Sequence, residues 1–272
     1  MSAKTVQFLI LTRLIKIMTK KNSNPRVAIY DLTDCEGCEV KIVSLREKLL
    51  VLEKRIDIVD WRLGQERKED GPFDVTLIEG APITQEEIDL IKSLREKSKF
   101  LIGLGSCATL GGIPAIMEKS EREKWCKKIY GEKYKPRGID ALPLSAYIPV
   151  DFLIHGCPIE ESELVRTVEE LLSGKKPSYR GYSVCFECKQ AGNPCRLIDE
   201  KPCLGPITQG GCGAVCVNGG SPCYGCFGLR EDANIDALLK ILNNITDPPG
   251  GEASKKEIER YFSMFLNKVD QE

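Results

Sequence analysis

The sequence predicts an α/β protein in which a flavodoxin-like parallel sheet is followed by a small cysteine-rich domain and by C-terminal helices. Strand and helix patterns alternate from Arg26 to about Leu172. The chain has 13 cysteines, and eight of them lie between Cys185 and Cys226 in a segment rich in glycine and proline. No G-x-G-x-x-G fingerprint follows the first strand, which favours a flavodoxin-like strand order over a Rossmann-like order.

Five apolar runs are expected to form the strands of the sheet. They lie at residues 26–32, 56–64, 73–80, 99–107 and 151–158. Because helical patterns separate these runs, the strands are expected to be parallel and covered on both faces.

Helical periodicity marks the segments between the strands. Residues 38–54 are expected to form one helix, and its apolar face comprises Val40, Val43, Leu45, Leu49 and Leu52. Thr84 and Glu87 form a capping box for the next helix. Gly174 is expected to end a later helix, which begins near residue 160.

The composition divides the chain into four parts. Residues 1–24 are a leader that is expected to be poorly ordered, and residues 25–176 form the sheet domain. Residues 177–230 form the cysteine-rich domain, and residues 231–272 form a C-terminal helical segment with two helices. The cysteine-rich part has few large apolar side chains, so metal bonds would supply the stability that a core does not.

Charge and hydropathy restrict the class of protein. Apolar residues make up 42% of the chain and charged residues 29%, as in an ordinary globular protein. The net charge of −1 gives no electrostatic footprint for nucleic acid. The N-terminal apolar stretch is interrupted by Arg13 and Lys16, so it is too short and too charged to span a membrane. A cytoplasmic localisation is expected, in which thiols bind metal rather than form disulfides.

Four cysteines are expected at one edge of the sheet. Cys35 and Cys38 follow the first strand, Cys107 ends the fourth, and Cys157 ends the fifth. Ligands of open parallel sheets sit outside the carboxyl ends of the strands, so these thiols should converge. Four thiolates make an S4 site that suits an iron–sulfur cluster or zinc. A thioredoxin-like dithiol would use only the first two cysteines.

The glycines of the loops around Cys107 have a simple interpretation. The stretches GLGS and LGGIP lack the lysine and hydroxyl residue of a phosphate-binding loop. Their glycines are instead expected to let the backbone approach a bulky cluster.

The eight later cysteines form two sets of four with tight spacing. The first set is Cys185, Cys188, Cys195 and Cys203, and the second is Cys212, Cys216, Cys223 and Cys226. Interleaved glycine and proline allow the turns that a cluster-wrapping loop requires. Zinc is also compatible with this spacing, although Cys2His2 fingers are excluded because His155 is the only histidine.

Two residues remain outside these sets. Cys126 is expected on a helix as a semi-buried residue without function. His155 is interpreted as a packing or hydrogen-bonding residue near the first set and not as a ligand.

Eight motifs resemble, in order, those of the small subunit of [NiFe] hydrogenases. Within that family the chain is similar to the cytoplasmic group 3 enzymes, namely sulfhydrogenase delta subunits and F420-non-reducing hydrogenase small subunits. The likeness covers roughly residues 26–230. The motifs are DCEGCEV, LIEG, GLGSCATLGGIPA, HGCP, CFECKQAGNPC, PCLGPIT, GCGAVC and PCYGCFG.

The resemblance implies three [4Fe–4S] clusters and a ferredoxin-like fold for the cysteine-rich domain. The proximal cluster would be held by Cys35, Cys38, Cys107 and Cys157, the medial cluster by Cys212, Cys216, Cys223 and Cys226, and the distal cluster by Cys185, Cys188, Cys195 and Cys203. Membrane-bound relatives have a histidine where this chain has Cys185, and a proline in place of one medial ligand. The fourth thiol of the medial set implies a [4Fe–4S] cluster of lower potential there, which suits a soluble acceptor more than a quinone. Ile159 replaces a second proline that is frequent after the last proximal cysteine.

The resemblance also implies partners and a division of labour. Hydrogen chemistry would occur at a nickel–iron centre on a separate large subunit, and this chain would have no catalytic residue of its own. A flavin- or ferredoxin-type electron-transfer subunit is a further expected partner. Glu79 is expected to shape the large-subunit interface or proton traffic, with a plain surface carboxylate as the alternative. The rival functions are a complex I-like quinone oxidoreductase subunit and a zinc-stabilised interaction module.

Overall fold

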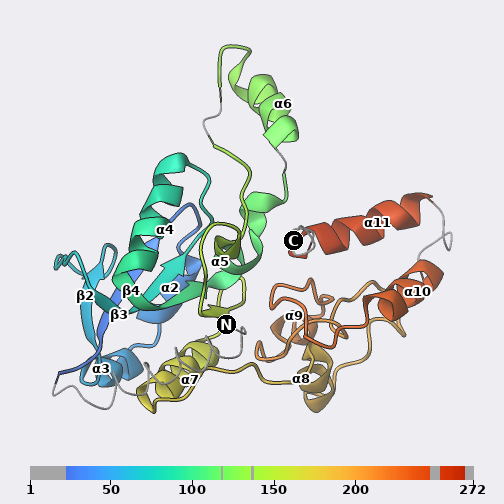
Figure 1. Ribbon diagram of the computed structural model, residues 1–272. Helices are drawn as coiled ribbons and strands as arrows, with labels where there is room; N and C mark the ends of the chain where they lie inside the picture. Colours follow the sequence, from blue (N-terminus) through green and yellow to red (C-terminus); the bar gives the residue numbers. More distant parts are fainter. Residues whose placement is uncertain (1–22, 118, 136–137, 246–251, 267–272) are drawn as a thin grey trace, which may run out of the picture.

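A five-stranded parallel sheet forms the centre of the first part of the protein (Figure 1). The computed structural model describes residues 23–117, 119–135, 138–245 and 252–266. The strands are β1 (Arg26–Asp31), β2 (Asp57–Trp61), β3 (Phe73–Glu79), β4 (Ser98–Leu104) and β5 (Phe152–Ile154). Their order is β2-β1-β3-β4-β5, and each neighbouring pair is parallel. The flavodoxin-like order predicted from the sequence is confirmed.

Helices cover both faces of this sheet, and each set of helices shares an apolar cluster with the strands. The strands alternate their side chains between the faces, so both faces need a cover. The helices of one face are α2 (Gly37–Val43), α3 (Glu47–Glu53) and α7 (Glu161–Leu172), and those of the other are α4 (Gln85–Lys97) and α5 (Gly105–Leu110).

The single helix expected over residues 38–54 is wrong. The chain forms α2 and α3 instead, because Arg46 between them has a φ of 51° and interrupts the helix. Ile42 takes the inward position on α2, while Val40 and Val43 are 60% and 57% exposed. Residues four apart share a helix face, so the face that carries Cys38 and Ile42 turns the two valines outward.

Other expected helix boundaries are confirmed. The Glu87 N–H donates to Thr84 Oγ1 at 3.2 Å, and the Thr84 N–H donates to Glu87 Oε2 at 3.0 Å, which completes the capping box of α4. Gly174 follows α7 with a φ of +71°, a conformation that favours glycine. The expected leader lies outside the described residues except for its last two.

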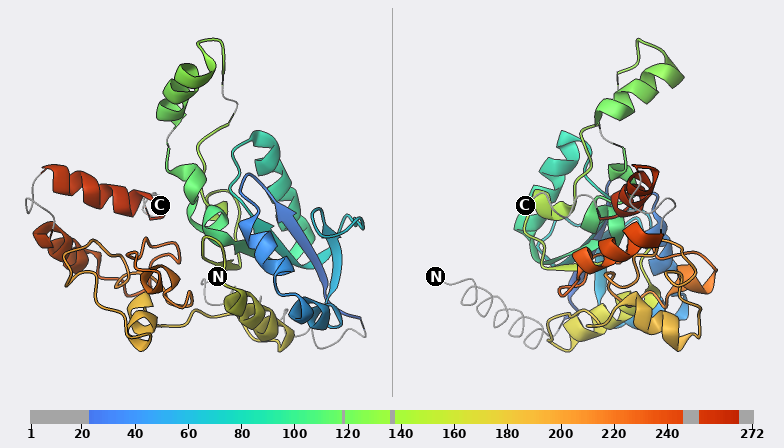
Figure 2. Two further views of the ribbon diagram at one scale, coloured as in Figure 1. Left: turned by 180° about the vertical axis from the view of Figure 1, so that it is seen from behind. Right: turned by 90° about the vertical axis from the view of Figure 1, so that its right-hand side faces the viewer.

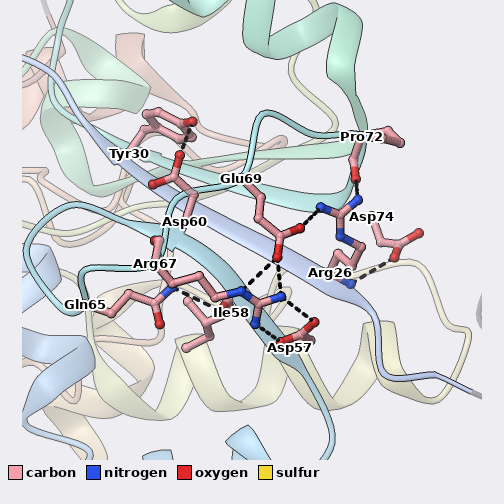
Figure 3. A network of polar contacts seen from close by, with 10 residues as sticks. All are labelled: Arg26, Tyr30, Asp57, Ile58, Asp60, Gln65, Arg67, Glu69, Pro72 and Asp74. Carbon is pink, nitrogen blue, oxygen red and sulfur yellow. Dashed lines mark hydrogen bonds and ion pairs between the residues drawn. The ribbon is translucent and has the colours of Figure 1, made fainter.

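An ionic network ties the loop between β2 and β3 to the start of β1 (Figure 3). Arg26 pairs with Glu69, and its Nη1 donates to the Pro72 carbonyl at 2.8 Å. Arg67 pairs with Asp57 at 2.7 Å and also with Glu69. These contacts lie at the amino ends of the strands, whereas the cysteines follow the carboxyl ends.

The cysteine-rich part is held mainly by turns and by a cover of two C-terminal helices. It contains only short helices, α8 (Val184–Gln190) and α9 (Val215–Asn218). The two expected C-terminal helices are observed as α10 (Ile235–Ile245) and α11 (Glu252–Ser263). They lie beside the cysteine-rich part (Figure 2). An apolar cluster that includes Leu204 joins them to it.

One further helix, α6 (Lys119–Tyr130), stands apart from the sheet in all views (Figures 1 and 2). A 3-10 turn at Ile113–Ala115 leads into it from α5. Within the described ranges, no helix combines the length and apolar character needed to cross a membrane.

Candidate metal centre

The first two cysteines lie where the chain passes from β1 into α2. Asp34 Oδ1 accepts a hydrogen bond from the Glu36 N–H at 2.7 Å, which fixes this segment, and Glu36 has a φ of 59°. Cys35 precedes the helix and is exposed, whereas Cys38 lies in its first turn and is buried.

Glu79, at the carboxyl end of β3, closes the amino end of α2. Its two oxygens accept hydrogen bonds from the N–H groups of Cys38, at 2.9 Å, and Glu39, at 2.7 Å. Burial raises the pKa of Glu79, and these hydrogen bonds act in the opposite direction. Glu79 is only 2% exposed, so the alternative of a plain surface carboxylate is wrong. Its role here is to satisfy helix N–H groups that have no partner within the helix.

Two further carboxyls near this segment were not identified from the sequence. Glu39 is buried and accepts a hydrogen bond from Trp61 Nε1 at 2.6 Å. Burial raises the pKa of Glu39 to about 7. Burial, with a contribution from Glu79, also raises the pKa of Asp34 to about 7. The sequence shows that Asp34 and Glu39 flank the first two cysteines, but it does not show how far each is removed from solvent.

Cys107 lies inside α5, just beyond the end of β4, and not at the end of the strand as expected. The strand stops because Gly105 has a φ of +77°. A Cβ at Gly105 would lie 2.3 Å from Cys38 Sγ, so only glycine lets the backbone pass this close to the thiol. Burial, followed by the neighbouring thiols of Cys157 and Cys35, raises the pKa of Cys107 to about 12.

Cys157 follows β5, in a loop that is held against α5. The Ser106 N–H donates to the Gly156 carbonyl at 2.7 Å. Burial raises the pKa of Cys157, and the next contributions come from Cys35 and Glu79. The structure thus brings Cys35, Cys38, Cys107 and Cys157 together at the carboxyl edge of the sheet.

The last set of cysteines lines a cavity of about 180 Å³. Cys157 of the first set lies in the wall of the same cavity. Burial, followed by the nearby Cys212 and Cys216, raises the pKa of Cys226 to about 12. The four residues of this set that line the cavity are Cys212, Cys216, Cys223 and Cys226.

The remaining set gathers at α8 and the loop that follows it. Burial, followed by Cys203, Cys188 and then Cys195, raises the pKa of Cys185 to about 11. A Cβ at Gly205 would lie 3.3 Å from Cys185 Sγ and 3.5 Å from Cys203 Sγ, so the backbone borders both thiols. The four residues of this set are therefore neighbours in space.

Short contacts join the three sets in series. Ser106 Oγ, beside Cys107, donates to the Cys226 carbonyl at 2.8 Å. The Cys223 N–H donates to Cys203 Sγ at 3.3 Å. The set from Cys212 to Cys226 therefore lies between the other two.

The donor set is suited to iron–sulfur clusters. All 13 cysteines are free thiols. Among the described residues, no group of three or more His, Cys, Asp or Glu side chains is arranged to hold a single metal ion. A [4Fe–4S] cluster takes four thiolates, one on each iron. Burial raises the pKa of thiols such as Cys203 and Cys212, so a bound metal would be needed to hold them as thiolates.

His155 and Cys126 lie outside the three cysteine sets. His155 Nδ1 lies 2.8 Å from Thr109 Oγ1, and a Cβ at Gly228 would lie 3.1 Å from the His155 ring. Burial lowers the pKa of His155 to about 4, so the ring is neutral at pH 7. Cys126 is partly exposed on α6, which stands apart from the three sets (Figure 1). These contacts support the interpretation of His155 as a packing residue.

Known proteins resemble this chain along most of its length. Residues 35–171 match the family described as NADH ubiquinone oxidoreductase, 20 Kd subunit. The sulfhydrogenase 2 subunit delta of Pyrococcus furiosus is 34% identical over 233 residues, which cover 85% of this chain and 97% of that protein. A vhu-type F420-non-reducing hydrogenase subunit of Methanococcus voltae is 30% identical over 261 residues, which cover 85% of this chain and 90% of that protein.

Solved structures share the fold. A chain of an NAD+-reducing [NiFe]-hydrogenase in the H2-reduced state aligns with a TM-score of 0.52 at 23% identity, over 58% of this chain and 96% of that chain. A chain of the [NiFeSe] hydrogenase from Desulfovibrio vulgaris Hildenborough aligns with a TM-score of 0.51 at 17% identity, over 81% and 97% of the two chains. The family match and the two relatives together show that the chain belongs to the NADH ubiquinone oxidoreductase 20 Kd subunit family, as a hydrogenase small subunit of the sulfhydrogenase delta and F420-non-reducing type.

Proposed function

We propose that this chain is the electron-relay subunit of a cytoplasmic [NiFe] hydrogenase of the sulfhydrogenase type. Each of the three cysteine sets would hold one [4Fe–4S] cluster. Residues 25–176 would carry the proximal cluster, residues 177–230 would carry the medial and distal clusters, and residues 231–272 would cover them. When bound, the clusters would carry electrons between a nickel–iron centre on a separate large subunit and a soluble acceptor.

The series arrangement of the cysteine sets is the observation that carries this proposal. Cys157 borders the cavity lined by the last set, and the backbone of Cys223 contacts Cys203 Sγ at 3.3 Å. A relay needs carriers that are close to one another and separated by protein. The order of contacts supports the assignment of Cys212 to Cys226 as medial and of Cys185 to Cys203 as distal.

The chain's own residues would position the clusters and control their surroundings. Glu79 fixes the segment that holds Cys35 and Cys38 by accepting two backbone hydrogen bonds. The buried ring of His155 fills the space between Thr109 and Gly228. Hydrogen bonding and solvent exclusion around the sulfurs are the means by which a protein sets cluster potentials.

The relatives support the proposed partners. They are subunits of a sulfhydrogenase and of F420-non-reducing hydrogenases, and a structural neighbour comes from a [NiFe]-hydrogenase. A large subunit with the nickel–iron centre and a flavin- or ferredoxin-type subunit are the proposed partners. The family description favours a second candidate, a complex I-like subunit, but the matched residues 35–171 leave out both C-terminal cysteine sets.

Serine variants test the three sets one at a time. Cys107→Ser, Cys216→Ser and Cys195→Ser should each remove one cluster, about four iron atoms per chain, and one electron paramagnetic resonance signal. Cys126→Ser is the matched control and should keep the full spectrum. A zinc-stabilised module would instead contain zinc and show no such signals in any variant, which would refute the proposal.

A further inference from the structure

Residues 113–117 and 119–135, which include α6, form an arm that stands apart from the sheet (Figure 1). None of the described side chains from Ser120 to Tyr130 is buried. A helix of 12 residues is marginal in water on its own, because most helices are stabilised by packing one face. The arm therefore lacks the packing that a helix of this length requires.

Large apolar side chains are exposed along the arm. Trp125 and Ile129, four residues apart, share one helix face and are 43% and 66% exposed. Tyr130 is 66% exposed and lies 4.8 Å from the ring of Tyr134 between centroids. Contiguous exposed apolar surface of this kind marks an interaction site, and Trp and Tyr are the residues that most often anchor protein interfaces.

The base of the arm is fixed, and its exposed apolar side chains include Trp125, over whose ring Lys128 Nζ lies at 4.7 Å from the centroid. Arg122 Nη2 donates to the carbonyl of Ile139 at 3.0 Å, and the Ile139 N–H donates to the Ile83 carbonyl at 2.7 Å. These bonds hold the returning segment against the body of the protein. The arm is thus presented in a defined direction.

The arm is basic although the whole chain is slightly acidic. Residues 119–135 contain seven Lys or Arg and three Glu, a net charge of +4, whereas the chain carries −1. By helical spacing, Lys124 and Lys127 lie away from the face of Trp125 and Ile129. Glutamates alternate with the basic residues of the helix, which suits the mixed charges of a protein surface better than a polyanion.

The position of the arm selects the partner. It begins at Ile113, directly after the helix that carries Cys107, and Ile113 and Ile116 are 51% and 45% exposed. The exposed apolar side chains of this segment thus include Ile113 and Ile116 next to the first cysteine set, and Trp125 and Ile129 on α6. The Ile113 N–H donates to the Cys107 thiol, which also has Cys35 as a neighbour, so a protein that covers the exposed Cys35 would meet the base of the arm.

We propose that the arm binds the subunit that carries the nickel–iron centre. On that subunit it would contact an acidic surface with an apolar recess for Trp125 and Ile129. This proposal rests on the proposed function, which requires that subunit to face the first cysteine set. Trp125 and Ile129 would supply the buried anchor, and the lysines would set the orientation and the salt dependence.

The test measures binding of the cluster-loaded full chain to the nickel–iron subunit. The double variant W125S/I129S should raise the dissociation constant at least about tenfold. The double variant K124E/K127E should weaken binding and flatten its dependence on salt. The matched controls are I241S on α10, where Ile241 is 44% exposed, and K92E on the exposed surface of α4, and both should bind like the wild type.

Iron content separates the possible outcomes. All variants should keep the iron of the wild type, because the arm lies outside the cysteine sets. Wild-type affinity in both arm variants would overturn this proposal and leave the proposed function intact. If the unmodified chain binds no nickel–iron subunit, the proposed function itself fails. Binding to phosphatidylglycerol vesicles that is lost only in the arm variants, with subunit pairing unchanged, would assign the arm to a membrane surface and overturn the proposal.

Discussion

At Gly105 the backbone passes Cys38 so closely that no side chain fits between them. The residue has a φ of +77°, and a Cβ would lie 2.3 Å from Cys38 Sγ. Glycine is therefore required both for the backbone conformation and for space. The sequence indicated that glycines of this loop allow a close approach, but not which glycine meets which thiol.

We expect Gly105→Ala to displace Cys38 and to lower the iron content by about four atoms per chain, the content of one [4Fe–4S] cluster. Gly174→Ala is the matched control, because Gly174 has a φ of +71° and no atom within 4 Å of an added Cβ. Its backbone strain should cost about 1–2 kcal/mol and no iron. Iron analysis of both proteins, purified anaerobically, makes the comparison. Equal iron in the two variants would contradict the close contact.

Single buried carboxyls were beyond what the sequence could predict. The sequence indicates the correct edge for Glu79 because this residue ends a strand, but its burial depends on α2, whose first N–H groups bind its carboxylate. Glu39 gave no sign of its bond to Trp61. A carboxyl is usually solvent-exposed, so composition and spacing favour the surface unless the partner amides are known.

At the scale of elements, the contact between α7 and the cysteine-rich part depends on the buried carboxylate of Glu163. Glu163 pairs with Arg166 of its own helix at 2.7 Å and with Arg180 of the following linker at 2.6 Å. A Cβ at Gly211, just before Cys212, would lie 3.0 Å from Glu163 Cδ. Glu163 therefore holds the linker and the last cysteine set against α7.

Glu163→Gln should destabilise the junction by about 2 kcal/mol, since it removes a mostly buried charge from two arginines that are partly exposed. The control is Glu161→Gln on the same helix, where the pair with Lys41 spans 3.7 Å and is about one-third exposed, so less than about 1 kcal/mol is expected. Denaturant unfolding of both variants gives the two free energies. Similar losses in both would mean that the buried tie is unimportant.

The ion pairs in the loop between β2 and β3 should make a pH-dependent contribution to the free energy of unfolding of the sheet. The hydrogen bond from Arg67 lowers the pKa of Glu69, partial burial acts against it, and Arg26 lowers it further. Since the pKa in the folded state lies below the ordinary value of 4.5, the contribution is full above pH 4.5 and is lost as the pH falls through the folded pKa.

Arg67→Ala should therefore raise the pH at which the sheet unfolds in acid, while Lys68→Ala in the same loop should not. Circular dichroism during acid titration measures both midpoints. An unchanged midpoint for Arg67→Ala would show that the network in Figure 3 contributes little.

Helices and strands were predictable from the sequence where local sequence alone determines them. The approximate positions of the strands and the capping box at Thr84 follow from local sequence and were confirmed, although β4 and β5 end earlier than expected. The helix over residues 38–54 was not, because its break at Arg46 depends on how α2 and α3 pack on the sheet. The apolar periodicity of a sequence does not reveal a helix break that is caused by tertiary packing.

Across the whole molecule, the stabilising ion pairs and the candidate metal ligands lie at opposite ends of the strands. The ionic network lies at the amino ends, and the first cysteine set lies at the carboxyl ends. The order of the strands made this convergence predictable, because parallel topology determines which loops meet. The serial contacts among the three sets were not predictable, since no rule of spacing relates Cys157 to Cys226.

Removal of iron should unfold the cysteine-rich part and leave the sheet folded. The apolar cluster in this part contains Cys188, Cys203 and Cys223 among its few members, so the thiols supply much of its core. Hydrogen exchange after chelation should show loss of protection in residues 177–230 and retained protection in β1, β3 and β4. Protection retained in both parts would mean that the cysteine-rich fold does not depend on metal.

The central claim is that twelve of the thirteen thiols form three cluster sites, and metal analysis of the anaerobically purified chain tests it most directly. The account predicts about twelve iron atoms and about twelve sulfide ions per chain, as three [4Fe–4S] clusters require. Stoichiometric zinc without sulfide, or iron for only one cluster in a fully folded chain, would contradict it.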